Sequence, residues 1–244
     1  MTKKTTLILF YSGVALICAG ILYVVNSIIV PSIKAKSDEA GAFINVGQTT
    51  EKTWFPIQKD LTATTQTGAS VKLSDLRGKV WVVAEFFAVC PHCAVRNGTE
   101  LRTIYDEFKG DPDFHMICIS VDPEADKAEK LNDYANALGA SSDNWWFLNA
   151  GEEKATHEYL EKTLKFFGIR ERTDPADIEE NGRFQHDMGL ILVDRDFNVI
   201  GKWPLADARS EQGRALDPTL YEKLKTEMFT RIREELAKES NLKN

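Results

Sequence analysis

Two cysteines, Cys90 and Cys93, have the spacing that most clearly suggests chemistry. They belong to the sequence Cys-Pro-His-Cys, which directly follows an apolar run of strand length. Proline suits the first position of a helix, so Cys90 is the predicted N-cap, and residues three apart share one helix face. A helix N-terminus stabilises an anion and lowers the pKa of a thiol. The resulting thiolate can attack a disulfide or bind a soft metal ion.

The remaining cysteines and the intervening histidine offer less. Cys18 lies in a long uncharged segment, and Cys118 lies in the apolar run 115–121, which indicates an inert buried thiol. A structural zinc site would need a second pair of Cys or His ligands at matching spacing, and the sequence has none. His92 lies between the two thiols, where we expect it to face solvent and only tune the site.

The segments around the cysteines alternate between strand and helix patterns. Strands are predicted at 79–87, 114–121, 145–148, 188–193 and 199–203, and helices at 90–109, 123–138, 152–167 and 218–238. This order predicts an α/β fold for residues 55–244: a thioredoxin-like mixed central sheet flanked by helices. An N-terminal transmembrane helix would precede this domain.

His186 lies directly before the strand predicted at 188–193. In a thioredoxin-like fold the loop entering that strand passes over the cysteine pair, and thiol oxidoreductases of this fold normally carry a cis-proline there. This chain has no proline between Pro175 and Pro204, so a histidine at that place suggests a third ligand beside two thiolates. Two sulfurs and one imidazole suit copper, as Cu(I) or Cu(II). A loop histidine that only caps a turn is the alternative.

Two further features carry no predicted chemistry. His157 lies among Glu and Lys residues of the helix predicted at 152–167, so we expect it on a solvated face. The polar, charged segment 170–182 is expected to form an exposed loop leading to His186. The loop is either a partner contact or a surface excursion.

Residues 7–30 form an uncharged, apolar segment that is long enough to cross a membrane. Roughly 24 residues, at about 1.5 Å per residue, span a hydrocarbon core of about 30 Å. A cleaved signal peptide would have a shorter apolar region and a small-residue cleavage site, and a lipoprotein would need a small residue in place of Ile17. We therefore predict an uncleaved anchor at 7–30, a cytoplasmic tail at 1–6 and a linker at 31–54.

The charge pattern bears on orientation and on partners. Lysines lie at both ends of the segment, so the positive-inside rule is nearly balanced. A short N-terminus usually stays inside, and no basic, Ser-rich transit peptide precedes the segment. We therefore expect a single-pass protein of a bacterial inner membrane with its C-terminal domain in the periplasm. The net charge of −7 argues against nucleic-acid binding.

Several stretches resemble the Sco/SenC family of copper chaperones for cytochrome c oxidase assembly. The similarity runs from about Phe55 to the C-terminus and includes the single N-terminal span. The matching stretches are Val71–Val80, the Cys90-Pro segment, Ile119–Glu124, Trp146–Leu148 and His186–Asp194. In that family two cysteines and this histidine bind copper. The resemblance therefore implies Cys90, Cys93 and His186 as copper ligands and a cytochrome c oxidase subunit as the partner.

The cysteine spacing departs from that family. Its members typically separate the two cysteines by three residues, whereas this chain separates Cys90 and Cys93 by two. Both spacings bring the sulfurs to one helix face, so copper binding stays possible. The shorter spacing is the one that thiol oxidoreductases use, and Cys-Pro-His-Cys resembles their strongly oxidising members.

Three functions follow from these residues. A copper chaperone, which is not an enzyme, would pass copper to thiols of its partner, with Cys90 and Cys93 cycling between dithiol and disulfide. A membrane-tethered thiol:disulfide oxidoreductase would use Cys90 as the attacking thiolate and Cys93 to resolve the mixed disulfide. A redox or copper sensor would use the same residues. His186 favours the chaperone.

Overall fold

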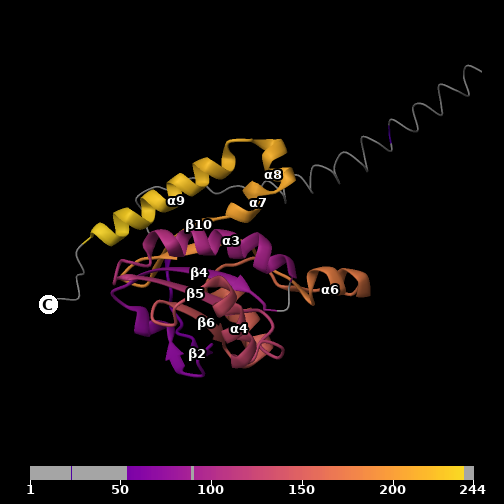
Figure 1. Cartoon of the computed structure of the whole chain (residues 1–244), viewed down its shortest axis with the longest axis horizontal. Helices are drawn as coiled ribbons and strands as arrows, with labels where there is room; N and C mark the ends of the chain where they lie inside the picture. Colours follow the sequence, from indigo (N-terminus) through magenta and orange to yellow (C-terminus); the bar gives the residue numbers. More distant parts are fainter. Residues whose placement is uncertain (1–22, 24–53, 89–90, 239–244) are drawn as a thin grey trace, which may run out of the picture. The chain divides into compact units, whose positions relative to one another are not determined.

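Three parallel strands form one half of the sheet in this computed structural model (Figure 1). β4 (Val80–Phe86) pairs with β5 (Phe114–Ser120) along its whole length, and β5 pairs with β6 (Trp145–Asn149). These strands are rich in apolar residues and largely buried, as is typical of parallel strands covered on both faces. On the other side of β4 lies the antiparallel hairpin of β9 (Leu190–Val193) and β10 (Asn198–Trp203).

The structure describes Tyr23, residues 54–88 and residues 91–238, without the side chains of residues 91–96 and 180. Contacts divide the chain into two units, Met1–Asn45 and Val46–Asn244, and the sheet belongs to the second. The predicted tail, the predicted anchor apart from Tyr23, and the predicted linker apart from Trp54 lie outside the described residues. Within the described part, no helix combines the length and the apolar character needed to cross a membrane.

Short strands complete both edges of the sheet. β1 (Phe55–Pro56) pairs with β10, and the hairpin of β2 (Thr62–Thr65) and β3 (Ser70–Lys72) pairs with β6 through β2. The strand order is β1-β10-β9-β4-β5-β6-β2-β3. The edge strands are too short to show a clear periodicity, which explains why the sequence did not predict them.

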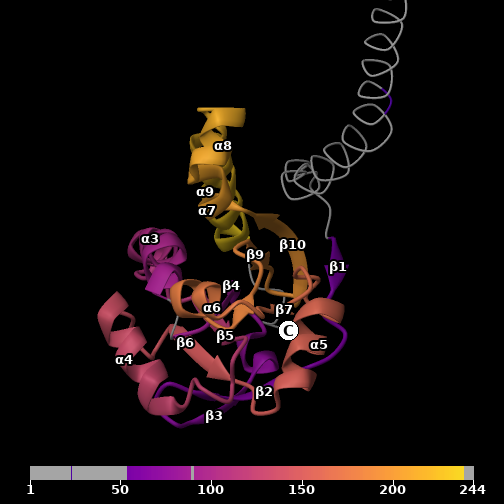
Figure 2. The same cartoon turned by 90° about the vertical axis from the view of Figure 1, so that its right-hand side faces the viewer.

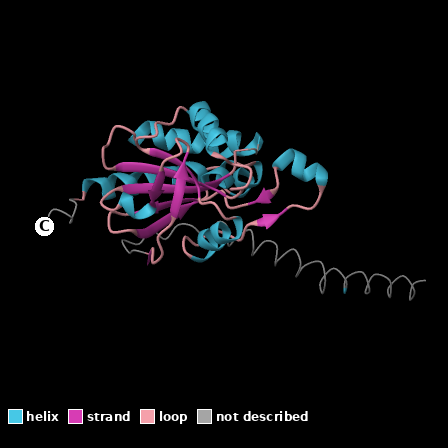
Figure 3. Cartoon of the chain, turned by 90° about the horizontal axis from the view of Figure 1, so that it is seen from below, coloured by secondary structure: helices cyan, strands magenta, loops and turns pink. Residues whose placement is uncertain are grey.

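Helices cover both faces of the sheet, as Figures 2 and 3 show. α3 (Pro91–Phe108), α4 (Ala128–Leu138) and α9 (Leu220–Ala237) pack on one face. α5 (Glu153–Lys162) and the 3-10 helix η2 (Leu73–Leu76) pack on the other. Each face of the sheet therefore has its own hydrophobic core.

The alternation of side chains along β4 supplies both cores. Val82 and Ala84 belong to the core beneath α3, whereas Trp81 and Val83 belong to the core beneath α5.

Two short helices that were not predicted, α7 (Leu205–Arg209) and α8 (Glu211–Leu216), lie between β10 and α9 in sequence. The predicted mixed sheet with helices on both faces is confirmed.

Two helix boundaries lie five residues from the predicted positions, at 128 instead of 123 and at 162 instead of 167. α4 begins at Ala128 and not at Pro123, because the segment after Asp122 forms a turn in which the N–H groups of Ala125 and Asp126 donate to the Asp122 carbonyl. α5 ends at Lys162 and not at Phe167. Beyond α5 the chain forms a turn in which Lys165 has a positive φ, and Leu164 and Phe166 on either side of it are buried in the core.

The burial of His115 in β5 makes the fold sensitive to acid. The residue is 4% exposed, its ring packs edge to face against Trp146, and its Nε2 atom has no hydrogen-bond partner among the described residues. Burial lowers the pKa of His115 to about 3, and the charge of Lys79 adds to this effect. Since the folded pKa lies below the unfolded value of about 6.5, this histidine stabilises the fold above pH 6.5 and destabilises it progressively as the pH falls.

We expect His115→Phe to remove this part of the pH dependence. Between about pH 6.5 and 3, the free energy of unfolding of the variant should fall less steeply than that of the wild type, by up to about 1.4 kcal/mol per pH unit. Urea unfolding at a series of pH values measures both slopes. Equal slopes would mean that His115 takes up its proton without unfolding.

Candidate metal centre

The cysteine motif lies where β4 leads into α3. Cys93 belongs to the first turn of α3, while Cys90 and the side chain of Cys93 lie outside the described part of the chain. The N-terminus of α3 follows the carboxyl end of a central parallel strand, which is where α/β folds commonly bind ligands (Figure 1). The positive end of the helix dipole is therefore available to stabilise a thiolate in this turn.

His186 lies in the loop between β8 (Phe184–Gln185) and β9. Its side chain is 3% exposed, and its ring packs edge to face against Phe87 with a centroid distance of 5.5 Å. Phe87 directly follows β4 and precedes Cys90 by three residues. The structure thus brings the imidazole to Phe87, in the segment that leads to the cysteines. The predicted ligand set of Cys90, Cys93 and His186 stays a prediction, since Cys90 lies outside the described residues.

The hydrogen bond of His186 defines its tautomer. Nδ1 lies 2.9 Å from the carbonyl oxygen of Asp187, which can only accept, so Nδ1 carries the proton. In the neutral ring the lone pair is then on Nε2. Burial lowers the pKa of His186 to about 4, although the hydrogen bond and charge of Asp187 act in the opposite direction. The ring is therefore neutral near pH 7, as a metal ligand must be.

Asp187 holds this loop in place from both sides. Its carboxylate accepts hydrogen bonds from the N–H groups of Phe167, at 2.8 Å, and Gly189, at 2.7 Å, and forms an ion pair with Lys202. Its own N–H donates to Oε2 of Glu85 at 2.9 Å. The His186 loop is therefore anchored to β4 and β10.

Glu85 is a residue of this site that the sequence analysis missed. It is fully buried, and burial raises the pKa of its carboxyl well above the usual value, an effect that the charge of Asp187 increases. A signal for Glu85 was present in the sequence. The apolar strand predicted at 79–87 begins with Lys79, and Glu85 is the only charged residue after it in that strand. Such residues are rarely fully buried without a partner.

Asp126 supports the cysteine segment from the other side. Its Oδ2 atom accepts hydrogen bonds from the N–H of Ala88, at 3.0 Å, and from the hydroxyl of Ser120, at 2.6 Å. Ala88 lies two residues before Cys90, so this carboxyl fixes the chain just before the motif. Burial raises the pKa of Asp126. The sequence analysis also missed this role.

The segment 170–182 is mostly exposed, as predicted, but it contains a strand and a helix and is not a loop, which corrects that part of the prediction. β7 (Arg170–Glu171) pairs with β8, and α6 (Pro175–Asn181) lies between them and contacts α3 (Figure 1). Asp174 caps α6, with Pro175 at its first position, and this is a helix start that the sequence contained.

Arg183 connects this excursion to the domain. Its guanidinium pairs with Glu171 at 2.8 Å and with Glu153 of α5 at 2.9 Å, and lies 3.9 Å from Asp122.

His157 was predicted on a solvated face, and this was wrong. It is half-buried, with Nε2 2.6 Å from the carbonyl oxygen of Val121 and its ring edge to face with Phe184.

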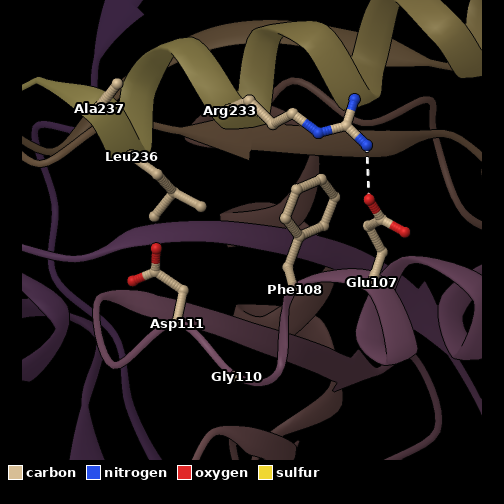
Figure 4. Close-up of a pocket in the computed structure, with 7 residues that line it drawn as sticks. All are labelled: Glu107, Phe108, Gly110, Asp111, Arg233, Leu236 and Ala237. Atoms are coloured by element: carbon tan, nitrogen blue, oxygen red, sulfur yellow. Dashed lines mark hydrogen bonds and ion pairs between the residues drawn. The ribbon is translucent and has the colours of Figure 1, made fainter.

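The described part of the chain has two surface hollows that neither His186 nor the first turn of α3 lines. One, of about 450 Å³, lies at the C-terminal end of α3, far along that helix from Cys93, and Arg233 pairs with Glu107 at its rim (Figure 4). The other, of about 460 Å³, includes Met188 and is otherwise lined from α7, α8 and the residue between them. Among the described side chains, no group of three or more His, Cys, Asp and Glu residues forms a metal site.

The contact between Gly182 and Phe87 can be tested directly. Gly182 has φ of +78°, and a Cβ atom there would lie 2.1 Å from Cε2 of Phe87. We expect Gly182→Ala to force Phe87 away and to lower the free energy of unfolding. Gly151→Ala is the matched control, since Gly151 has φ of +91° with open space around it. In urea unfolding, Gly182→Ala should cost roughly 1–3 kcal/mol more than the control. Equal losses would contradict the close contact.

Comparisons with known proteins agree with this architecture. The family model described as SCO1/SenC matches residues 49–219, which is more than half of the chain. The SCO1 protein homolog of Bacillus subtilis (strain 168) is 30% identical over 148 residues, covering 60% of this chain and 76% of the relative.

Solved structures share the fold. BsSco, described as a Sco-family cytochrome c oxidase assembly protein with a disulfide switch, has a TM-score of 0.59 and 20% identity, and the match covers 80% of this chain and 99% of BsSco. Copper-bound ScoI of Bradyrhizobium japonicum has a TM-score of 0.51 and 18% identity, with 70% and 98% covered. These structural matches show the thioredoxin-like Sco fold. Together with the sequence match, they lead to the conclusion that this chain belongs to the SCO1/SenC family.

Proposed function

We propose that this protein is a copper-binding assembly factor that delivers copper to a cytochrome c oxidase subunit, or reduces a disulfide of that subunit to two thiols while Cys90 and Cys93 form a disulfide. Membership of the SCO1/SenC family supports the proposal, as do a relative described as a cytochrome c oxidase assembly protein and another solved with copper bound. The observation that carries it is the position of His186 beside the segment leading to the cysteines, where the thiol oxidoreductases have proline.

The chemistry of the proposed donors fits copper. Two thiolates are soft ligands that suit Cu(I), and imidazole is accepted by Cu(I) and Cu(II). His186 supplies a neutral ring whose Nδ1–H is held by a carbonyl, so the lone pair is on Nε2. Copper would be the cargo of this site, held by Cys90, Cys93 and His186 and passed on by exchange with thiols of the partner.

The predicted anchor completes the proposal. A helix at residues 7–30 would tether the domain to the outer surface of a bacterial inner membrane, with the domain in the periplasm. Such a tether raises the local concentration of the domain near a membrane-bound partner. The uncharged character of this segment and its length support this part of the proposal.

A thiol:disulfide oxidoreductase is the second candidate. Cys93 in the first turn of α3 and the Cys-Pro-His-Cys spacing favour it, because a helix N-terminus lowers the thiol pKa. Cys90 would attack a partner disulfide and release one partner thiolate, and Cys93 would then displace the second and close the Cys90–Cys93 disulfide. This candidate leaves His186 without a role.

The variant His186→Ala separates the two candidates. We expect it to abolish stoichiometric copper binding, because one of three ligands is lost, while the rate of disulfide exchange with glutathione stays close to that of the wild type. Anaerobic titration of the full-length chain with Cu(I) against a competing chelator, together with absorption and EPR spectra after loading with Cu(II), measures binding.

His157→Gln is the matched control, since it removes a half-buried histidine elsewhere and should leave copper binding unchanged. Cys90→Ser and Cys93→Ser should each lose both copper binding and complete disulfide exchange. Wild-type copper affinity in His186→Ala would remove the main reason for preferring the copper carrier, and the oxidoreductase would then be the better description.

A further inference from the structure

Glu85 occupies a position at which the fold calls for an apolar side chain. Along β4 alternate residues face the same core, and Trp81 and Val83 before it and Phe87 after it all pack there. Glu85 lies between them with no exposed surface. Burying a carboxyl group is costly unless its oxygens are fully hydrogen-bonded. The fold alone would therefore be served better by an apolar residue.

The contacts of Glu85 are directed at the His186 loop. Oε2 accepts the N–H of Asp187 at 2.9 Å and lies 3.8 Å from Nδ1 of His186. Oε1 is buried and has no hydrogen-bond partner in the described part of the chain. One oxygen of the carboxyl group therefore accepts a backbone hydrogen bond beside the histidine, and the other has no hydrogen-bond partner among the described residues.

The Nδ1–H of His186 consequently faces two acceptors. It donates to the carbonyl oxygen of Asp187 at 2.9 Å, and the Glu85 oxygen is slightly farther away at 3.8 Å. A metal ion on Nε2 withdraws electron density from the ring and makes the Nδ1–H a stronger donor. Ligating histidines usually donate this second N–H to a carboxylate, a carbonyl or water, which fixes the tautomer and the ring orientation.

We propose that Glu85 is a positioning residue for copper binding by His186. Its Oε2 atom holds the backbone N–H of Asp187, the residue whose carbonyl oxygen accepts the Nδ1–H of His186, and it lies 3.8 Å from Nδ1 as a second acceptor for that N–H. The inference rests on the proposed function, because it assigns Glu85 a role only through the copper-binding histidine. It explains why β4 carries a buried acid beside the cysteine motif.

Two substitutions of Glu85 test the inference. Glu85→Gln keeps an acceptor oxygen for the Asp187 N–H and for Nδ1, whereas Glu85→Leu keeps neither. We expect Glu85→Leu to lower the copper affinity of the full-length chain by about 10–100-fold, the usual effect of losing such a residue. Glu85→Gln should stay near the wild-type affinity.

A copper-free measurement accompanies the titration. The ¹⁵N chemical shifts of the His186 ring in the copper-free protein report which nitrogen carries the proton. Wild type and Glu85→Gln should show the Nδ1–H tautomer, and Glu85→Leu should show a mixture of both tautomers. Glu235→Leu is the matched control, because Glu235 is a buried carboxyl in α9 that pairs with Arg231 and Lys238. It should leave both readouts unchanged even where it lowers stability.

The outcomes are distinguishable. If the wild type binds copper and Glu85→Leu binds it equally well with an unchanged tautomer, the role of Glu85 is refuted and the proposed function stands. Equal loss of affinity in Glu85→Leu and Glu235→Leu would also refute it, since the effect would then be general destabilisation. If the wild type itself binds no copper, the proposed function fails and this inference fails with it.

Discussion

The hydrogen bond from the Asp187 N–H to the buried carboxyl of Glu85 connects the two parts of the chain on which the candidate site depends. One part is β4, which leads into the cysteine helix, and the other is the loop that carries His186. These segments are about a hundred residues apart in sequence, and sheet pairing brings them together because β9 lies antiparallel to β4. The pairing of β9 with β4 brings the His186 loop close to the end of β4, and the buried hydrogen bond fixes the position of that loop.

The proposed ligands need two opposite environments. A cysteine binds metal as an anion, and the helix N-terminus provides the positive potential for that. A histidine binds metal as a neutral ring, and burial provides this by lowering the pKa of His186 to about 4. Placing the cysteine motif at the start of α3 and the imidazole in the protein interior meets both needs near the carboxyl end of the central strand β4.

The elements that the sequence predicted well have strong local signals. β4 and β5 are continuous apolar runs, and α3 begins at a proline that suits the first turn. α5 ends five residues earlier than its pattern suggests, because Leu164 and Phe166 reach the core in a turn instead of a helix. The spacing of apolar residues in this segment is compatible both with a longer helix and with a turn that buries Leu164 and Phe166.

The site was predictable only in part for a related reason. His186 could be identified from its place before a strand, but the partners of its ring could not, since they depend on long-range pairing. Glu85 contacts Asp187, 102 positions away, and Asp126 contacts Ala88, 38 positions away, and nothing in their local pattern indicates the partner. The structure of 170–182 was missed because its charged composition is typical of loops, although Asp174-Pro175 begins a helix there.

The short strands at the two ends of the sheet have a consequence for the behaviour of many copies at once. β1 has two residues and ends in Pro56, and β3 has three and ends in Lys72. Proline cannot donate a backbone hydrogen bond, and a lysine on an outer strand repels a second copy, so within the described residues neither edge strand offers a long template for strand addition. A protein built this way can be present at high local density without joining sheet to sheet into aggregates.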